Sequence, residues 1–236
     1  MADTAETASD WAAQTESRLL EAALPLVPKL GWTSRLVAGA AKAVGLTTPE
    51  AELLLPQGAR DLAALFSYRH DEAAMAALAG VDPRALKIRE RIARGVEARV
   101  EAAMADETAL RRWMGYLALP QNLVMGARLA WDSADRIWTW AGDVSTDENH
   151  YSKRAILAGL LTSTLMVRAA DSPAGARRHL DRGIEAVMTY ERLKAKAAPG
   201  DLAARAAGML GRMRYGAGPI PAAEASPSAK TPTTAP

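Results

Sequence analysis

The residues best suited to chemistry lie in one stretch, 131–154, where a tryptophan-rich helix end meets a polar, charged turn. Large aromatic side chains beside mixed polar groups, in a turn between two helices, are typical of a surface that docks a partner protein. The alternative is structural, with the tryptophans in a core and Ser145 with Glu148 capping the next helix. The predicted docking residues are Ile137, Trp138, Trp140, Asp143, Asp147, His150, Tyr151 and Arg154.

Catalytic chemistry fits the same stretch less well. Asp147 and His150 have the spacing of two metal ligands on a helix, but a carboxylate-bridged diiron site needs Glu-x-x-His pairs, and the sequence contains none. Asp143, Ser145 and His150 are the residue types of a hydrolase triad, yet no Gly-x-Ser-x-Gly elbow is present. We therefore predict no catalytic residue, no metal site and no cofactor.

The composition sets the class of protein to which these residues belong. The chain has 236 residues, of which 49% are apolar and 24% charged, so it can bury a core. The absence of cysteine excludes disulfides, thiolate metal sites and a cysteine nucleophile. The formal net charge of +2 is too small to indicate nucleic-acid binding by the protein as a whole.

The hydrophobic pattern predicts an all-α fold, because apolar residues recur at helical spacing and no stretch alternates for long. Helices are expected at about residues 10–30, 33–43, 47–55, 59–78, 82–104, 106–140 with a break at Pro120, 145–170, 172–198 and 201–214. Gly31 and Gly45 are expected to end the first two helices, Thr47 with Glu50 to cap the third, and Asp82 with Pro83 to start the fifth. The predicted organisation is a flexible N-terminus (1–9), a helix-turn-helix-like subdomain (10–80), a helical bundle (81–198) to which the resemblance given below assigns lipid binding, an amphipathic membrane-binding helix (199–215) and a disordered tail (216–236).

Residues 33–55 fit a helix-turn-helix, two short helices joined through Gly45, and with their neighbours resemble the N-terminal region of TetR-type regulators. The helix that would enter the major groove carries Glu50 and Glu52 but no side chain that reads a base edge. We therefore expect no binding to nucleic acid. A TetR-type ligand-sensing transcriptional regulator stays the alternative function, and a salt-dependent gel shift with duplex DNA would distinguish it.

Two apolar segments after residue 116 could line a pocket for a lipid. A pocket for an isoprenoid chain needs a long apolar lining without unsatisfied polar groups. The same residues could simply fill a core between packed helices, and the pattern alone favours that interpretation. The candidate lipid-binding residues are Leu119, Leu123, Met125, Leu129, Leu157, Leu160, Leu161 and Leu165.

The helix predicted over 201–214 has an apolar stripe edged by arginines, which suits weak, reversible attachment to a membrane surface. Packing on its own domain or on a dimer partner is the alternative. The candidate membrane residues are Leu202, Arg205, Met209, Leu210, Arg212 and Met213. The acidic start lacks a signal or transit pattern, and the apolar run 155–167 is too short to span a bilayer. We expect a bacterial cytoplasmic protein peripheral to the inner membrane.

The segment Ala-Gly-Asp-Val-Ser-Thr-Asp at 141–147, followed by Asn149, Tyr151, Lys153 and Arg154, resembles the signature of the coenzyme Q biosynthesis protein nine family. Further matches occur in order at Gly31-Trp32-Thr33, Gly45-Leu46, Arg89 to Ile92 with Arg99, and Leu119-Pro120-Gln121-Asn122, so the resemblance spans about residues 19–213.

This resemblance implies a TetR-like, all-helical accessory protein of ubiquinone biosynthesis that neither binds DNA nor catalyses. It implies a C-terminal pocket for an isoprenoid quinone intermediate or phospholipid, and docking to a hydroxylase of the pathway. The family has a Trp-Tyr pair in the docking patch, and His150 replaces the tryptophan here, so the identity of the hydroxylase stays open. A homodimer is expected by analogy with TetR-like folds. A scaffold that holds no lipid is a third possibility, which native mass spectrometry would distinguish.

Overall fold

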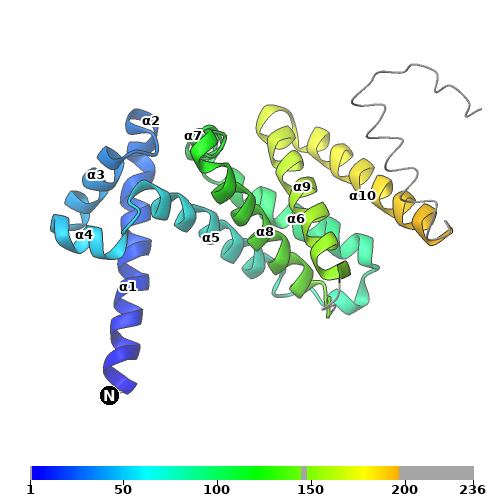
Figure 1. The fold of residues 1–236 in the computed structure, drawn as a ribbon, viewed down its shortest axis with the longest axis horizontal. Helices are drawn as coiled ribbons and strands as arrows, with labels where there is room; N and C mark the ends of the chain where they lie inside the picture. The colour runs from blue at the N-terminus through cyan, green and yellow to red at the C-terminus, as the bar shows by residue number, and fades with distance from the viewer. Residues whose placement is uncertain (1, 145–147, 197–236) are drawn as a thin grey trace, which may run out of the picture. The chain divides into compact units, whose positions relative to one another are not determined.

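A computed structural model describes residues 2–144 and 148–196, and in these residues the chain forms helices and turns without strands (Figure 1). The predicted all-α class is confirmed, and the architecture is consistent with a TetR-like bundle. The α-helices are α1 (Ala2–Ala23), α2 (Val27–Leu30), α3 (Ser34–Val44), α4 (Thr48–Leu54), α5 (Ala59–Leu78), α6 (Ile88–Met104), α7 (Glu107–Leu117), α8 (Leu123–Trp140), α9 (Glu148–Ala170) and α10 (Pro173–Lys196). Three 3₁₀ turns are η1 (Leu24–Leu26), η2 (Pro83–Ala85) and η3 (Pro120–Asn122).

The chain divides after Ala186 into two compact units, and all sites described below belong to the first. In the described residues, no helix is both long and apolar enough to cross a membrane. The C-terminal amphipathic helix and the tail predicted over 199–236 lie outside the described residues.

Two predicted helix boundaries differ from the structure, and in both places the chain contains proline. The helix expected over 10–30 begins already at Ala2 and is divided into α1, η1 and α2. Pro25 and Pro28 follow the end of α1, and a proline inside a helix removes one backbone hydrogen bond and clashes with the preceding turn. Likewise, Pro83 opens only the short turn η2, and α6 begins five residues later than predicted from that proline.

The predicted caps of the helix-turn-helix are confirmed. Gly45 ends α3 with φ of 79°, a left-handed conformation that glycine adopts without strain. The backbone N–H of Thr47 donates to the Glu50 carboxylate at 2.8 Å, and the Glu50 N–H donates to the Thr47 hydroxyl at 3.4 Å. This capping box starts α4, and the hydrogen bonds from Thr47 lower the pKa of the Glu50 carboxyl.

The hydrophobic core runs from the N-terminal helices into the bundle. Phe66 of α5 is fully buried and packs against the rings of Trp32 and Trp113, so one side chain joins α5 to the α2–α3 turn and to α7. Further along the bundle, α6 and α8 approach closely at Gly95, where a methyl group in place of the hydrogen would collide with Ile137. The five helices α5 to α9 pack together in this way, and they enclose the cavity described next.

Candidate lipid cavity and docking turn

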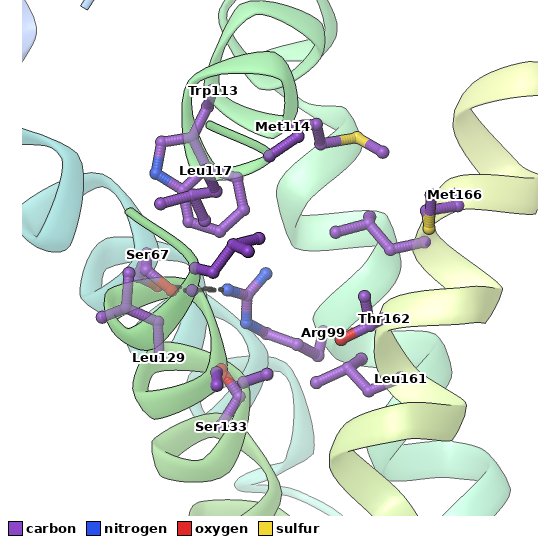
Figure 2. Close-up of a pocket in the computed structure, with 16 residues that line it drawn as sticks. Ser67, Arg99, Trp113, Met114, Leu117, Leu129, Ser133, Leu161, Thr162 and Met166 are labelled. Atoms are coloured by element: carbon purple, nitrogen blue, oxygen red, sulfur yellow. Dashed lines mark hydrogen bonds between the residues drawn. The ribbon is translucent and has the colours of Figure 1, made fainter. Parts of the chain in front are cut away.

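A cavity of about 360 Å³ lies among helices α5 to α9 (Figure 2). This volume falls within the usual range of small-molecule sites, and most of the wall is hydrocarbon. The lining residues are Ser67, Arg99, Trp113, Met114, Leu117, Ala118, Leu123, Gly126, Ala127, Leu129, Ala130, Ser133, Leu161, Thr162, Leu165 and Met166.

Half of the predicted lipid-binding residues line this cavity, namely Leu123 and Leu129 on α8 and Leu161 and Leu165 on α9. Leu161 and Leu165 are four apart and so share one face of α9, whereas Leu123 and Leu129 are six apart and lie on different sides of the α8 surface that borders the cavity. The other members of the predicted set project elsewhere. Leu157 is buried in the core at 2% exposed, Leu160 packs against Gly183 of α10, Met125 faces a separate hollow beside α5, and Leu119 is 43% exposed.

The sequence analysis missed the residues that other helices bring to the cavity. Ser67 comes from α5, Arg99 from α6, and Trp113 with Met114 from α7. Trp113 is held in place because its indole N–H donates to the backbone oxygen of Ala63 at 2.8 Å. No local pattern marks these residues, because they lie near α8 and α9 only through tertiary packing.

One wall of the cavity contains a buried polar cluster. The Arg99 guanidinium pairs with Asp71, and the Ser133 hydroxyl donates to the same carboxylate oxygen of Asp71 at 2.6 Å. Arg99 Nη2 also donates to the Ser67 hydroxyl at 3.1 Å. Arg99 and Asp71 are 4% and 1% exposed, so each charge depends on the other for stabilisation.

His70, on α5 like Ser67 and Asp71, is buried and is neutral at pH 7. Its Nε2 lies 3.1 Å from an Asp106 carboxylate oxygen, and its ring meets Phe66 edge-on at 4.3 Å between centroids. Burial, and then the positive charge of Arg99, lower the pKa of His70 to about 4. In the described part of the chain, no three acidic or histidine side chains are grouped so as to hold a metal ion.

The cavity opens to the surface at its apolar rim. Leu123 and Met166 both line it, and they are 55% and 56% exposed. Val124, next in the chain, is 82% exposed. Exposed apolar side chains at the mouth of an apolar cavity are suited to the entry of an apolar molecule.

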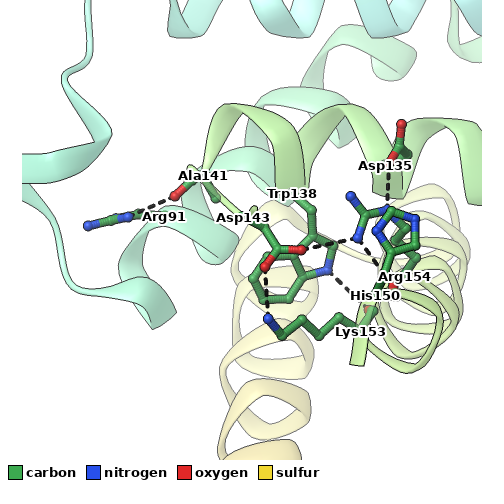
Figure 3. Close-up of polar contacts among 8 residues, drawn as sticks. All are labelled: Arg91, Asp135, Trp138, Ala141, Asp143, His150, Lys153 and Arg154. Carbon is green, nitrogen blue, oxygen red and sulfur yellow. Dashed lines mark hydrogen bonds and ion pairs between the residues drawn. The ribbon is translucent and has the colours of Figure 1, made fainter. Parts of the chain in front are cut away.

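The turn between α8 and α9 is held by a second polar network (Figure 3). Arg154 donates to Asp135 at 2.5 Å, to Asp143 at 3.1 Å and to the backbone oxygen of His150 at 3.2 Å. Lys153 pairs with the other oxygen of Asp143 at 2.8 Å. These contacts connect the end of α8 to the first turns of α9.

Nearby, the Trp138 indole donates to the backbone oxygen of Lys153 at 3.1 Å, and Lys153 Nζ lies 5.4 Å from the centre of the Trp138 ring. From α6, Arg91 donates to the backbone oxygen of Ala141 at 2.7 Å. The predicted docking segment is therefore a well-connected structural unit, and only part of it faces solvent.

Burial separates the predicted docking residues into two groups. Ile137 is 1% exposed, Arg154 is 3% exposed, and the Asp143 side chain is 6% exposed, so these residues hold the turn and offer a partner little surface. Tyr151 is 65% exposed, whereas Trp138, Trp140 and His150 are partly exposed. Val144, which the sequence analysis did not single out, is 91% exposed. Asp147 lies outside the described residues, as do all six candidate membrane residues in 202–213.

The exposed aromatic group of the turn consists of Tyr151 and its neighbours. The Tyr151 ring lies 6.2 Å from that of Trp131 and 5.1 Å from that of His150 between centroids. On α4, by contrast, the exposed side chains include Glu50 and Glu52, and Leu53 is 78% exposed. That surface lacks the basic side chains that contact with DNA phosphates requires.

Comparison with known proteins shows similarity over this same region. The COQ9 family model matches residues 123–191, which include α8, α9 and most of α10. The ubiquinone biosynthesis protein COQ9, mitochondrial, of Rattus norvegicus is 31% identical over 67% of this chain and 53% of its own length. The protein of the same name in Bos taurus is 30% identical over 67% of this chain and 52% of its own length.

The probable ubiquinone biosynthesis protein coq9, mitochondrial, of Dictyostelium discoideum is 27% identical over 66% of this chain and 52% of its own length. The chain thus spans about half the length of the curated relatives that it matches. The family match covers the α8–α9 turn and the part of the cavity formed by those helices, and the relatives extend the similarity over two thirds of the chain. The chain belongs to the COQ9 family.

Proposed function

We propose that this protein is a non-catalytic accessory protein of ubiquinone biosynthesis, which binds a prenylated quinone precursor and presents it to a hydroxylase. The observation that carries the proposal is the cavity among α5 to α9, whose wall is apolar and whose mouth is open. The names of the relatives, all ubiquinone biosynthesis proteins, support the pathway. An apolar cavity favours an apolar ligand because such a ligand loses little hydration on entering.

The size of the cavity indicates which part of the ligand it holds. A volume of about 360 Å³ lies near the lower end of the usual range for small-molecule sites. A substituted ring with the first part of its chain fills that volume, and a long polyprenyl chain exceeds it. The rest of the chain then leaves at Leu123 and Met166, where the rim is apolar.

The proposed membrane contact uses the segment 199–215, whose sequence places Leu202, Met209, Leu210 and Met213 on one stripe with Arg205 and Arg212 at its edge. Peripheral attachment brings the cavity close to the bilayer in which prenylated precursors dissolve. The protein would act as a homodimer in the bacterial cytoplasm, at the inner membrane.

The hydroxylase would dock on the exposed side of the α8–α9 turn. Tyr151 supplies a large exposed ring and Val144 supplies exposed apolar surface, while Arg154 ties the first turns of α9 to Asp135 and Asp143. Rigid aromatic side chains contribute strongly to binding because they lose little conformational entropy on association.

Extraction of the purified protein with organic solvent, followed by mass spectrometry, tests the lipid proposal directly. We expect a prenylated quinone precursor in stoichiometric amount. Ala130→Phe places a ring in the cavity and should reduce the extracted lipid at least tenfold, whereas Ala155→Phe, on the exposed face of α9, should not. Wild-type protein that carries no lipid would refute the proposal and favour a scaffold.

Tyr151→Lys tests the docking surface. The substitution removes an exposed ring and should weaken the complex with the hydroxylase without changing thermal stability, because Tyr151 is 65% exposed. Leu53→Lys is the matched control, since it replaces an exposed apolar residue on α4. Equal complex formation by wild type and Tyr151→Lys in co-purification would exclude this surface.

Vesicle flotation tests the membrane contact. Met209→Glu with Leu210→Glu, in the full chain, places two charges on the apolar stripe and should abolish flotation with anionic vesicles. Substituting Ala204 and Gly208 by Glu, on the opposite side of the same predicted helix, serves as the control. Undiminished flotation of the first variant argues against the contact.

A further inference from the structure

We infer that Arg99 is the polar anchor of the cavity, and that it donates a hydrogen bond from Nη1 to a neutral oxygen on the ring of the bound molecule. This inference rests on the proposed function and deepens it. It assigns a binding role to a residue on α6, outside the match to the family model at 123–191, and it names the part of the ligand that lies deepest.

Two of the three nitrogens of the Arg99 guanidinium have a hydrogen-bond partner among the described residues, and Nη1 has none. Its side chain is 5% exposed, Nε pairs with Asp71, and Nη2 donates to Ser67. Nη1 makes no hydrogen bond to any residue that the structure describes. In Figure 2, the amino group that is not bonded to Ser67 points into the space enclosed by the apolar side chains.

An amino group in such surroundings is costly unless something accepts its hydrogen bonds. A donor that faces an apolar cavity is poorly hydrated, and without an acceptor it gains nothing in return. The remaining wall is apolar except for short hydroxyl side chains at Ser67, Ser133 and Thr162, and the first two already bond within the cluster. Thr162 Oγ1 donates to the backbone oxygen of Ala158 at 2.8 Å. An oxygen atom of a ligand would accept the hydrogen bond that Arg99 Nη1 has to offer.

The charge balance of the cluster selects a neutral oxygen. Asp71 already neutralises Arg99, and the pair is buried. A carboxylate or phosphate group on the ligand would bring a second anion into an apolar space, where its desolvation penalty exceeds what a paired arginine returns. A ring carbonyl or hydroxyl oxygen accepts the same hydrogen bond without that penalty.

This arrangement also orients the ligand. Arg99 lies on the wall formed by α5 and α6, whereas the exposed residues Leu123 and Met166 mark the mouth on α8 and α9. A molecule whose ring oxygen contacts Arg99 therefore extends its chain toward the mouth. Arg99 at the inner wall and the apolar residues at the mouth are together suited to an amphiphile with one neutral polar ring and one apolar chain.

The test compares the affinities of three prenylated probes, which carry neutral oxygens, no oxygen or a carboxylate. Calorimetric titration uses 2,3-dimethoxy-5-methyl-6-prenylbenzoquinone, a prenyl-pentamethylbenzene of similar size without oxygen, and 4-prenylbenzoic acid. The key variant is Arg99→Lys, which retains a charge for Asp71 but loses the planar fork that supplies Nη1. Arg128→Lys is the control, because its side chain on α8 is 78% exposed and does not line the cavity.

We expect Arg99→Lys to lower the affinity for the quinone about tenfold or more, which is the loss of one charge-assisted hydrogen bond, and to change the hydrocarbon affinity less than about twofold. Arg128→Lys should change neither. An unchanged quinone affinity, or an equal loss for quinone and hydrocarbon, would overturn the anchor. Tighter, Arg99-dependent binding of the acid would overturn the assignment of a neutral oxygen.

Two further measurements keep the result interpretable. If Arg99→Lys does not fold, Arg99→Met with Asp71→Leu removes the whole pair and the same criteria apply to it. If wild-type protein yields a prenylated precursor on extraction and Arg99→Lys yields as much, the anchor fails while the proposed function stands. Wild-type protein that carries no precursor and binds no probe refutes the proposed function itself.

Discussion

Two buried arginines, Arg99 in the cavity wall and Arg154 in the α8–α9 turn, are 4% and 3% exposed and differ in what surrounds them. Arg154 binds two carboxylates and a backbone oxygen, all from residues within twenty positions of it. Arg99 binds one carboxylate and one serine, both on α5, and leaves one amino group toward a cavity. Each arginine keeps one amino group without a hydrogen bond to a residue that the structure describes, but of the two only Arg99 lines the cavity.

This difference separates a structural arginine from a binding one. Burial of a charge alone does not indicate function, because a guanidinium held by two carboxylates, such as that of Arg154, can serve only to join the ends of two helices. The distinguishing observation is the cavity, because at Arg99 the amino group without an acceptor among the described residues has space for a ligand beside it. Substitutions of the two arginines, with and without their carboxylate partners, measure how the two sites differ in their contribution to stability.

The largest effect is expected for Arg99→Met. It leaves Asp71, 1% exposed, with only the Ser133 hydroxyl, and a buried charge that loses its partner costs about 3 to 5 kcal/mol. Urea unfolding at pH 7 measures the loss. Adding Asp71→Leu should restore the stability to within about 1 kcal/mol of wild type, because an apolar pair can replace a buried ion pair. A double variant as unstable as Arg99→Met would contradict this account.

A smaller effect is expected for Arg154→Met, about 2 to 3 kcal/mol in the same measurement, because its partners keep other stabilisation. Lys153 still pairs with Asp143, and the Asp135 side chain is 46% exposed. Arg128→Met, which replaces an arginine that is 78% exposed, should change the stability by less than about 0.5 kcal/mol. A larger loss of unfolding free energy for Arg154→Met than for Arg99→Met would contradict the comparison.

The smallest of the three effects concerns pH, and among the two arginines it involves Arg99 and not Arg154. The pKa of His70 is about 4 in the folded protein against an ordinary value of 6.5, so between these values the unfolded chain takes up a proton that the folded chain does not. Stability therefore falls as the pH falls, by about 2 kcal/mol between pH 7 and pH 5 from this group.

Urea unfolding at both pH values checks this loss, with His70→Gln as the variant that should lack it. Arg154→Met should retain it, whereas Arg99→Met with Asp71→Leu should reduce it, because the positive charge of Arg99 helps to lower the pKa of His70. The same loss in wild type and in His70→Gln would show that other groups cause it.

Much of the fold could be predicted from local patterns. The capping box of Thr47 and Glu50, the helix ends at Gly31 and Gly45 and the break at Pro120 are confirmed, because each depends on residues within a few positions in the chain. The predicted start at Asp82-Pro83 was wrong for α6, since the same cap and proline also begin a single 3₁₀ turn.

The candidate site could be predicted only in part. Helical periodicity identified the apolar faces of α8 and α9, and therefore Leu123, Leu129, Leu161 and Leu165, but it could not distinguish a residue facing a cavity from one facing a neighbouring helix. Ile137 was assigned to a docking surface because it lies among tryptophans, yet its helix face meets Gly95 of α6.

By itself, the sequence determined which segments become helices, where most of them end, and which family signature connects α8 to α9, because capping, proline geometry and periodicity act over a few residues. Only the tertiary structure decided that a space remains among five helices, and that Arg99, with its partners on another helix, presents an unpaired N–H to it. Packing joins residues dozens of positions apart, and no pattern along the chain records which of them will meet.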